Sequence, residues 1–179
     1  NSRCIEQMRL TEPEPRTSIP TLRSGDVMWK DYTVKAYVRP MIIEHFSGIL
    51  FRYQTSMMHY GFFLVKDGVE IHCVNKLERK VLAQAQVSYE KEAYNLLTVE
   101  TDGSSIKCYL NNKLVLEVND TTYENGAIAL CSCRPTRFKD IEVTMTDLQY
   151  EAYEKDTKAY EEELNKRKGK HIAPKLWKK

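Results

Sequence analysis

The sequence predicts an all-β fold, an antiparallel β-sandwich jelly roll followed by one C-terminal α-helix. Short runs of alternating apolar and polar residues recur about every ten residues along most of the chain. Turn residues such as Asp-Gly and Asn-Asn separate these runs. After residue 146 the apolar period lengthens from two to about 3.5 residues, which indicates a helix.

Two successive hairpins are expected in the middle of the chain. Residues 94–101 alternate between two unlike faces, and an Asp-Gly-Ser turn at 102–104 ends the run. Glycine supplies the positive φ that such a tight reversal requires. Residues 106–110 and 114–118 form the next pair, joined by an Asn-Asn turn at 111–112, because asparagine tolerates the left-handed region.

The other predicted strands show similar patterns. Residues 32–38 place apolar side chains on one face, and Pro40 terminates that strand because proline cannot donate to the ladder. Residues 78–87 are ambiguous, since their Ala-Gln-Ala-Gln run suits a helix as well as a strand. The remaining strands are expected over residues 47–54, 60–65, 69–74, 126–131 and 138–145.

The same patterns divide the chain into four parts. Residues 1–24 are an extended N-terminal lead-in, because their prolines disfavour a helix. The sandwich spans residues 25–146, and residues 147–170 form an amphipathic helix that is expected to dock on it. Residues 171–179 are interpreted as a linker to a further, covalently linked domain. The apolar stripe of the helix consists of Tyr150, Tyr153, Thr157, Tyr160 and Leu164.

Composition and motifs exclude several classes of function. Lys plus Arg number 27 against 25 acidic residues, so the net charge of +2 gives no broad nucleic-acid footprint. No apolar run of membrane length is present. P-loop, dinucleotide-binding, HExxH and GxSxG motifs are also absent. The five cysteines lack the spacing of a redox pair or a zinc site, and we interpret them as structural thiols.

The order of five motifs resembles a known superfamily. They are Gly25-Asp26 with Trp29 and Tyr32, Ser47 to Arg52 (SGILFR), Asn111-Asn112 with Leu114-Val115, Gly126 to Leu130 (GAIAL), and Phe138 with Ile141. In this order they resemble the concanavalin-A-like lectin and glucanase jelly roll. Within that superfamily the chain is most similar to laminin-G-like modules and to the 3-keto-disaccharide hydrolase-like group. The resemblance implies two curved sheets whose concave face or rim loops receive glycans, and an extracellular or periplasmic location.

The residues offer their own candidates for a ligand site. Ile49, Phe51 and Tyr53 make the better core face of their strand, which leaves Arg52 and Gln54 on the opposite face. A planar guanidinium and an amide in phase suit the recognition of hydroxyl or carboxylate groups. We therefore expect Arg52 and Gln54 to bind ligand.

Two neighbouring strands and a loop add further candidates. Tyr60 and Phe62 are expected to supply a stacking platform, since the C–H faces of sugars pack on aromatic rings. His72 is a fourth candidate, and Arg134 belongs to a loose basic cluster with Arg137 and Lys139.

A structural interpretation of the same residues remains open. Arg52 is then paired with a cross-strand acid such as Glu70 or Glu100, the aromatic rings belong to the core, and the basic loop is solvated.

Three functions are consistent with the sequence. The first is a non-catalytic carbohydrate-binding or accessory module of a larger polysaccharide-degrading protein, with an oligosaccharide or polysaccharide as partner. The second is a glycosidase-like or 3-keto-disaccharide hydrolase acting at the concave face around Arg52, although no catalytic residue is assigned. The Glu-x-Asp-x-x-Glu strand of catalytic superfamily members is absent. The third is a structural spacer domain.

Calcium is an open alternative as a cofactor. The superfamily includes calcium-binding members, and loop carboxylates supply the hard oxygen ligands that this ion prefers. The candidate carboxylates are Asp26, Asp31, Asp102, Asp120 and Asp140.

Overall fold

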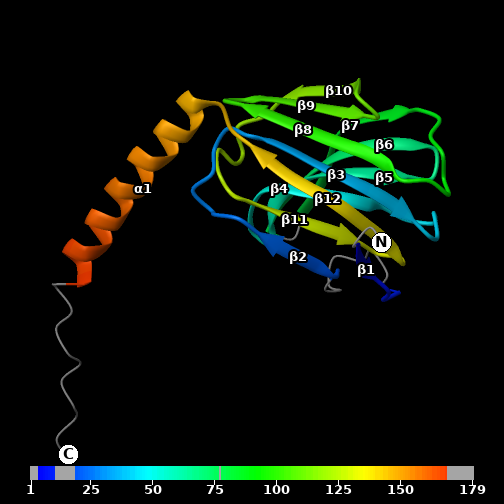
Figure 1. Cartoon of the computed structure of the whole chain (residues 1–179), viewed down its shortest axis with the longest axis horizontal. Coiled ribbons are helices and arrows are strands. Elements are labelled where there is room, and N and C mark those ends of the chain that lie inside the picture. The colour runs from blue at the N-terminus through cyan, green and yellow to red at the C-terminus, as the bar shows by residue number, and fades with distance from the viewer. Residues whose placement is uncertain (1–3, 11–18, 77, 169–179) are drawn as a thin grey trace, which may run out of the picture.

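The structure is a computed structural model that describes residues 4–10, 19–76 and 78–168. Two six-stranded antiparallel sheets lie face to face, and a long helix extends from one end of them (Figure 1). The predicted fold class, an antiparallel β-sandwich jelly roll with a C-terminal helix, is confirmed.

The chain passes several times from one sheet to the other, so each sheet combines strands that are distant in the sequence. The strands of sheet A are β1 (Ile5–Gln7), β3 (Thr33–Pro40), β8 (Asn95–Asp102), β9 (Ser105–Leu110), β10 (Lys113–Asn119) and β12 (Thr136–Thr144). Their order across the sheet is β1-β12-β3-β8-β9-β10. The strands of sheet B are β2 (Thr21–Ser24), β4 (Ser47–Thr55), β5 (Met58–Val65), β6 (Gly68–Asn75), β7 (Glu78–Gln86) and β11 (Ala127–Ser132). Their order is β2-β11-β4-β5-β6-β7.

The two expected hairpins join β8 to β9 and β9 to β10. Gly103 has φ of 54° in the first turn. Asn111 and Asn112 have φ of 51° and 66° in the second, which makes a two-residue turn with both central residues in the left-handed region. Such turns match the twist of the paired strands, so the hairpin signal in the sequence was sufficient here.

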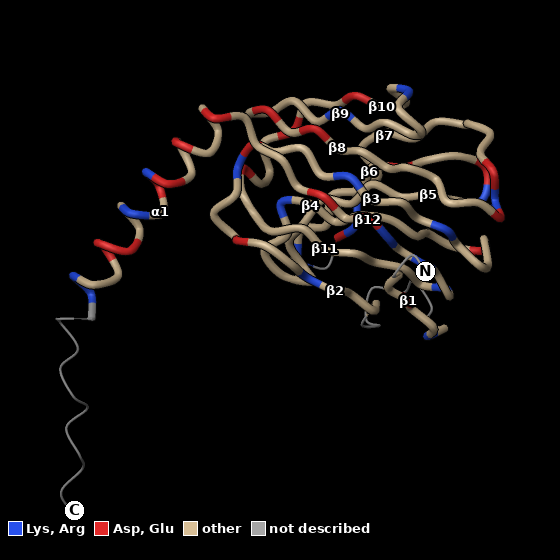
Figure 2. The backbone as a smooth tube through the Cα atoms, in the orientation of Figure 1, with Lys and Arg blue, Asp and Glu red and all other residues tan. Residues whose placement is uncertain are grey.

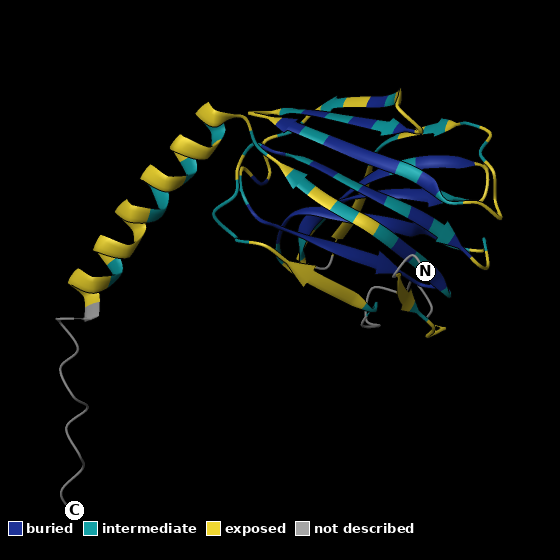
Figure 3. Cartoon of the chain, in the orientation of Figure 1, coloured by how far each residue is buried: buried dark blue, intermediate teal, exposed yellow. Residues whose placement is uncertain are grey.

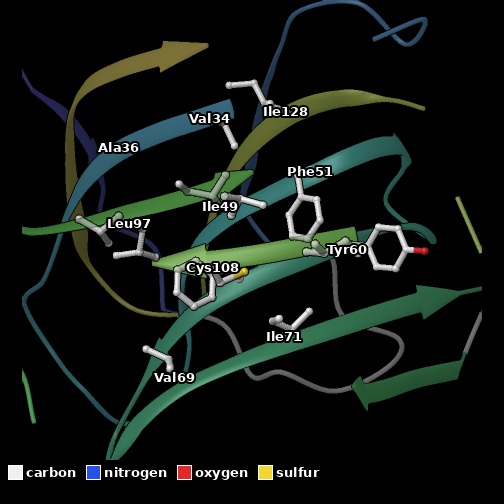
Figure 4. Packing of buried hydrophobic residues seen from close by; sticks show 14 of the residues in the cluster. Val34, Ala36, Ile49, Phe51, Tyr60, Val69, Ile71, Leu97, Cys108 and Ile128 are labelled. Carbon is white, nitrogen blue, oxygen red and sulfur yellow. The ribbon is translucent and has the colours of Figure 1, made fainter. Parts of the chain in front are cut away.

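The main core lies between the sheets. Val34 and Ala36 of β3 and Leu97 of β8 are fully buried from sheet A, and Ile49 of β4 is fully buried from sheet B. Figure 4 shows these side chains pointing into the space between the two layers. The alternation seen in the sequence therefore places one apolar face of each sheet against the other.

The lead-in and the ambiguous segment both contribute strands. β1 pairs with β12 and β2 pairs with β11, so parts of residues 1–24 are edge strands of the two sheets. Residues 78–86 form β7, the opposite edge of sheet B, and no helix. The pairings of β1 and β2 join segments far apart in the sequence, so local patterns could not reveal them.

The helix α1 (Asp147–Lys168) is largely exposed (Figure 3). Tyr153 donates its hydroxyl proton to Asp26 at 3.1 Å, and Lys30 pairs with Asp156. Beyond these first turns the helix projects away from the sheets, and Tyr160 is 48% exposed. The expected docking of the whole stripe is therefore wrong. The predicted residues 169–170 of the helix and the predicted linker 171–179 lie outside the described residues.

A β-bulge in β4 changes which residues face the core. Arg52 has φ of 43°, and the pairing register with β5 shifts between Phe51 and Thr55. Phe51 remains in the core between the sheets, while Tyr53 joins a cluster on the other side of sheet B. A bulge inserts one extra residue and reverses the alternation beyond it, so the expected shared face of Phe51 and Tyr53 is wrong.

Within the described part of the chain, no helix combines the length and the apolar character needed to span a membrane.

Candidate functional site

The outer face of sheet B carries a second apolar cluster. Exposed faces of antiparallel sheets are usually polar, so buried aromatic side chains on such a face are informative. We call this group the outer cluster. Its members are Phe46, Leu50, Tyr53, Phe63, Ala129, Cys131 and Cys133.

A glycine in β5 makes room for the central ring of the outer cluster. A Cβ atom on Gly61 would lie 2.2 Å from the Phe63 ring and 3.1 Å from the Leu50 side chain. A glycine inside a strand often marks such a close approach. The Phe63 ring can therefore lie flat along the sheet, where the Phe46 ring meets it at a centroid distance of 4.6 Å.

A histidine–carboxylate pair borders these rings. His72 Nε2 lies 2.5 Å from a carboxylate oxygen of Glu70, and its ring contacts Phe63 at 5.0 Å between centroids. Burial lowers the pKa of His72 more than the Glu70 hydrogen bond raises it. The His72 hydrogen bond lowers the pKa of Glu70. Both pKa shifts agree with a neutral imidazole that donates a hydrogen bond to an ionised carboxylate. The contact is therefore a hydrogen bond and no ion pair.

An arginine completes the polar side of this region. The Arg79 guanidinium lies 5.0 Å from the centroid of the Phe46 ring, within the range of a cation–π contact. A groove of about 530 Å³ lies beside it, a size typical of small-ligand sites. Its walls include Phe46, Glu70, Arg79 and Gln84. We call this the sheet B groove.

A second histidine extends the same face toward the bulge. The His59 ring stacks on Tyr53 with centroids 5.5 Å apart, and its Nδ1 lies 3.1 Å from the backbone oxygen of Thr55. Burial is the main cause of the lowered pKa of His59. The outer face of sheet B thus holds two buried, neutral imidazoles among aromatic rings.

Arg52 lies elsewhere, at the end of the sandwich nearest the helix. Its side chain is 1% exposed. Nε donates to the Lys30 oxygen at 3.3 Å, and Nη1 to the Tyr123 oxygen at 3.1 Å. Nη2 donates to the Gly103 oxygen at 2.7 Å and to Asp31 at 3.2 Å. The guanidinium therefore ties three loops together, and its acid partner is neither Glu70 nor Glu100.

Three other predicted site residues are also distant from the sheet B groove. Gln54 donates to the Asn125 oxygen at 3.4 Å, beside the Arg52 network. Tyr60 and Phe62 are fully buried between the sheets, and the Tyr60 hydroxyl donates to Asp120 at 2.5 Å. These two rings point into the core, and only the residues that alternate with them along β5 point outward. They therefore cannot form a stacking platform for a ligand.

The predicted basic cluster is divided between the two sheets. Arg134 is buried and its Nε donates to Glu44 at 3.2 Å, near the sheet B groove. Arg137 and Lys139 belong to β12 in sheet A. Of the six residues predicted to bind ligand, His72 contacts the Phe46 and Phe63 rings of the outer cluster, and Arg134 reaches the groove through Glu44.

Sequence reasoning missed Phe46, Phe63, Glu70 and Arg79. A usable signal was present in β5, where His59, Gly61 and Phe63 alternate with the core residues. A histidine, a glycine and a phenylalanine in phase do not look like a solvated strand face. The cation–π contact of Arg79 depends on a long-range approach of β7 and a loop, which the sequence does not encode locally.

Among residues 4–10, 19–76 and 78–168, no group of three or more His, Cys, Asp or Glu side chains is arranged to hold a metal ion. Three of the calcium candidates have protein partners instead. Asp26 accepts from the Met28 amide, Asp31 from the Gly103 amide and Asp120 from the Thr122 amide.

Comparisons with known proteins place the fold. No family model and no curated protein sequence matches the chain. The solved structure of carbohydrate-binding module CBM66 from Bacillus subtilis has a TM-score of 0.62 at 14% identity, over 76% of this chain and 99% of that one. Galectin LEC-6 from Caenorhabditis elegans has a TM-score of 0.58 at 9% identity, over 78% of this chain and 96% of that one.

A catalytic protein is similar as well. A xylan β-1,4-xylosidase from Bacillus halodurans C-125 has a TM-score of 0.57 at 11% identity, over 76% of this chain and 32% of that one. At such low identities these likenesses establish the fold alone. The chain has the concanavalin-A-like jelly-roll fold.

Proposed function

We propose that this domain is a non-catalytic carbohydrate-binding module and that the sheet B groove receives the sugar. The single observation that carries the proposal is the groove itself. It combines the Phe46 ring, the Arg79 guanidinium and the Glu70 carboxylate within one concavity, and the buried His72 ring contacts Glu70.

The chemistry of these groups suits a sugar. Aromatic rings pack against the C–H faces of a pyranose or furanose as they do against other apolar surfaces. Carboxylate oxygens accept hydrogen bonds from sugar hydroxyls, guanidinium groups donate hydrogen bonds to them, and amide groups do both. All three groups are planar, so these hydrogen bonds have defined directions. Because His72 holds Glu70 in place, the free lone pairs of this carboxylate are already oriented before ligand arrives.

The same groups argue against glycoside hydrolysis in this groove. A glycosidase needs one carboxylic acid with a raised pKa as proton donor. The pKa of Glu70 is lowered by its hydrogen bond from His72, so Glu70 is ionised at neutral pH. Glu44, another carboxylate of the groove wall, is paired with Arg134. We therefore assign a binding role and no catalytic one.

The wider setting of the module is also part of the proposal. One structural neighbour is itself described as a carbohydrate-binding module and another as a galectin. A third is a much larger xylosidase. These likenesses support an accessory module in a polysaccharide-degrading protein, and we propose in addition that this protein works outside the cytoplasm.

A thermal-shift screen against neutral plant and host oligosaccharides, followed by calorimetric titration of each hit, tests the proposal. Specific binding to the native state must raise the melting temperature by mass action. We expect the shift to disappear in Arg79→Ala and Gln84→Ala, since both side chains are exposed on the groove wall and can be removed without disturbing the core.

The matched control is Lys35→Ala, on the outer face of sheet A. It should leave the sugar-dependent shift unchanged. The proposal fails if no neutral sugar binds at millimolar concentration, or if the groove variants bind as well as the original chain.

A further inference from the structure

Two arginines face each other on the outer side of sheet A. Arg39 of β3 and Arg137 of β12 are directly paired in the antiparallel register. Like charges in this position repel each other and destabilise a sheet. Figure 2 shows the Lys and Arg positions of the two strands near the end where β1 lies.

A lysine continues this basic surface along β12. Lys139 is paired with Tyr37 in the register, and its ammonium lies 5.2 Å from the Tyr37 ring centroid. The same ammonium lies 4.7 Å from the centroid of the Tyr94 ring. Two cation–π contacts hold the charge at the sheet surface and restrict a side chain that is normally mobile.

Carboxylates only partly offset these cations. Arg137 Nε lies 2.5 Å from Glu6, and Lys139 lies 3.5 Å from the exposed carboxylate of Asp140. Arg39 has no hydrogen-bond or ion-pair partner in the described ranges of the chain. Within the described residues, Glu6 therefore offsets the charge of Arg137, whereas the charge of Arg39 has no acidic partner.

Elsewhere on the same face the charges are paired in the ordinary way. Lys35 of β3 lies opposite Glu142 in the register. Lys107 of β9 lies opposite Glu100 and 3.8 Å from Glu117. The Arg39–Arg137 pair departs from this pattern, and the departure suggests that an anion from outside the chain supplies the missing charge.

A bulge in β12 separates the segment that contains Arg137 and Lys139 from the segment that contains Glu142. Asp140 has φ of 51°, and the register with β3 shifts between Lys139 and Glu142. Bulges often re-aim side chains beside binding sites. Arg137 and Lys139 therefore lie on one side of the bulge, and Glu142 lies on the other.

We propose that Arg39, Arg137 and Lys139 form a second binding site, for the sulfate or carboxylate groups of an acidic polysaccharide. This basic site lies on the face of the molecule opposite the sheet B groove and is independent of it. Guanidinium groups bind such oxyanions through two parallel hydrogen bonds. Successive residues on one face of a strand are about 7 Å apart, so the arginine pair and Lys139 suit a chain that carries repeated charges.

Nucleic acid fits the basic site less well. Sequence-independent binding of single strands needs aromatic rings that stack on bases. Here the nearby Tyr37 and Tyr94 rings already receive Lys139. The net charge of +2 also gives little long-range attraction for a nucleic acid.

Dextran sulfate and uncharged dextran, which share a backbone, are the probes for titration calorimetry with the full chain. Polygalacturonate tests carboxylate groups, and a single-stranded oligodeoxynucleotide tests nucleic acid. We expect dextran sulfate or polygalacturonate to bind, dextran not to bind, and inorganic sulfate to compete only weakly. Binding should weaken as salt rises, because exposed charges are screened.

Four variants with the same change of charge locate the site. Arg39→Gln and Lys139→Gln should each weaken polyanion binding by about tenfold, the loss expected for a charge-assisted hydrogen bond. Lys35→Gln and Lys107→Gln, on the same face, should weaken it less than about twofold, because an acid lies directly opposite each of them in the register. Melting curves of all four confirm that each variant is folded.

Three results would overturn the second site. One is the absence of polyanion binding at low salt. Another is an equal loss of affinity in all four variants, which would show an effect of net charge alone. The third is binding of the oligodeoxynucleotide as tightly as the acidic polysaccharides.

Discussion

His72 Nε2 lies 2.5 Å from a carboxylate oxygen of Glu70, on a sheet face where the Phe46 and Phe63 rings surround the imidazole. This contact fixes the orientation of Glu70, one of the polar groups of the sheet B groove. Burial keeps His72 a neutral donor, because burial lowers the pKa of the ring more than the carboxylate raises it. The Glu70–His72 pair therefore shapes the groove and makes the stability of the fold depend on pH.

Stability should fall as the pH drops from 7 to 5. Burial lowers the pKa values of His59 and His72 below their usual value of 6.5. Below about pH 6.5 the unfolded chain binds protons that the folded chain does not, so protons favour unfolding. Glu70, with its lowered pKa, extends the loss to lower pH as its carboxylate becomes protonated. The charged neighbours of His72 include Arg79, which further opposes protonation.

Chemical denaturation at a series of pH values measures this dependence. In His72→Gln, which keeps a hydrogen-bond donor but has no titrating ring, the slope between pH 7 and 5 should be shallower. A free energy of unfolding that is flat over this range, or a slope unchanged in His72→Gln, contradicts the assignment.

Arg52→Ala should destabilise the fold by about 3 kcal/mol, because it removes a buried guanidinium that donates to the oxygens of Lys30, Gly103 and Tyr123 and pairs with Asp31. Urea denaturation checks this value. Arg23→Ala on the exposed strand β2 is the matched control, expected to change stability by less than about 0.5 kcal/mol. Equal midpoints for the two variants would disprove the role of Arg52 as a link between loops.

Asn112→Ala should cost about 1 kcal/mol, because its φ of 66° is unfavourable for a residue with an ordinary Cβ. Asn112→Gly should be close to neutral, since glycine adopts this conformation freely. Thermal unfolding of both variants separates backbone strain from the loss of the side chain. If alanine and glycine have the same effect, the turn does not depend on a left-handed residue at this position.

Removal of α1 should lower the free energy of unfolding by less than about 1 kcal/mol. The contacts that would be lost, Tyr153 with Asp26 and Lys30 with Asp156, lie at the surface. A chain that ends at residue 146 and the full chain can be compared in urea. A loss of several kcal/mol would mean that the stripe docks on the sandwich after all.

Much of the fold was predictable because its patterns are local. The burial of Val34, Ala36 and Val38 follows the alternation in the sequence. The turns at Gly103 and Asn111-Asn112 contain the residues that their backbone conformations favour. Each of these features depends on a few neighbouring residues, and none depends on a distant contact.

The candidate site was harder to predict because a bulge and long-range contacts create it. Arg52 has a positive φ that non-glycine residues seldom adopt, so no local pattern indicated that the alternation would reverse before Tyr53. The neighbours of His72 come from a loop at Phe46 and from the edge strand at Arg79. The alternation of residues along one strand does not show which loops or edge strands pack against that strand.

Mapping of sugar contacts by amide chemical-shift changes tests the central proposal most directly. An oligosaccharide that stabilises the chain would be titrated into the ¹⁵N-labelled protein. The sheet B groove predicts the largest changes at Phe46, Glu70, His72, Arg79 and Gln84. Changes confined to Gly103 and Tyr123 around Arg52, or to the strands of sheet A, would contradict the proposal.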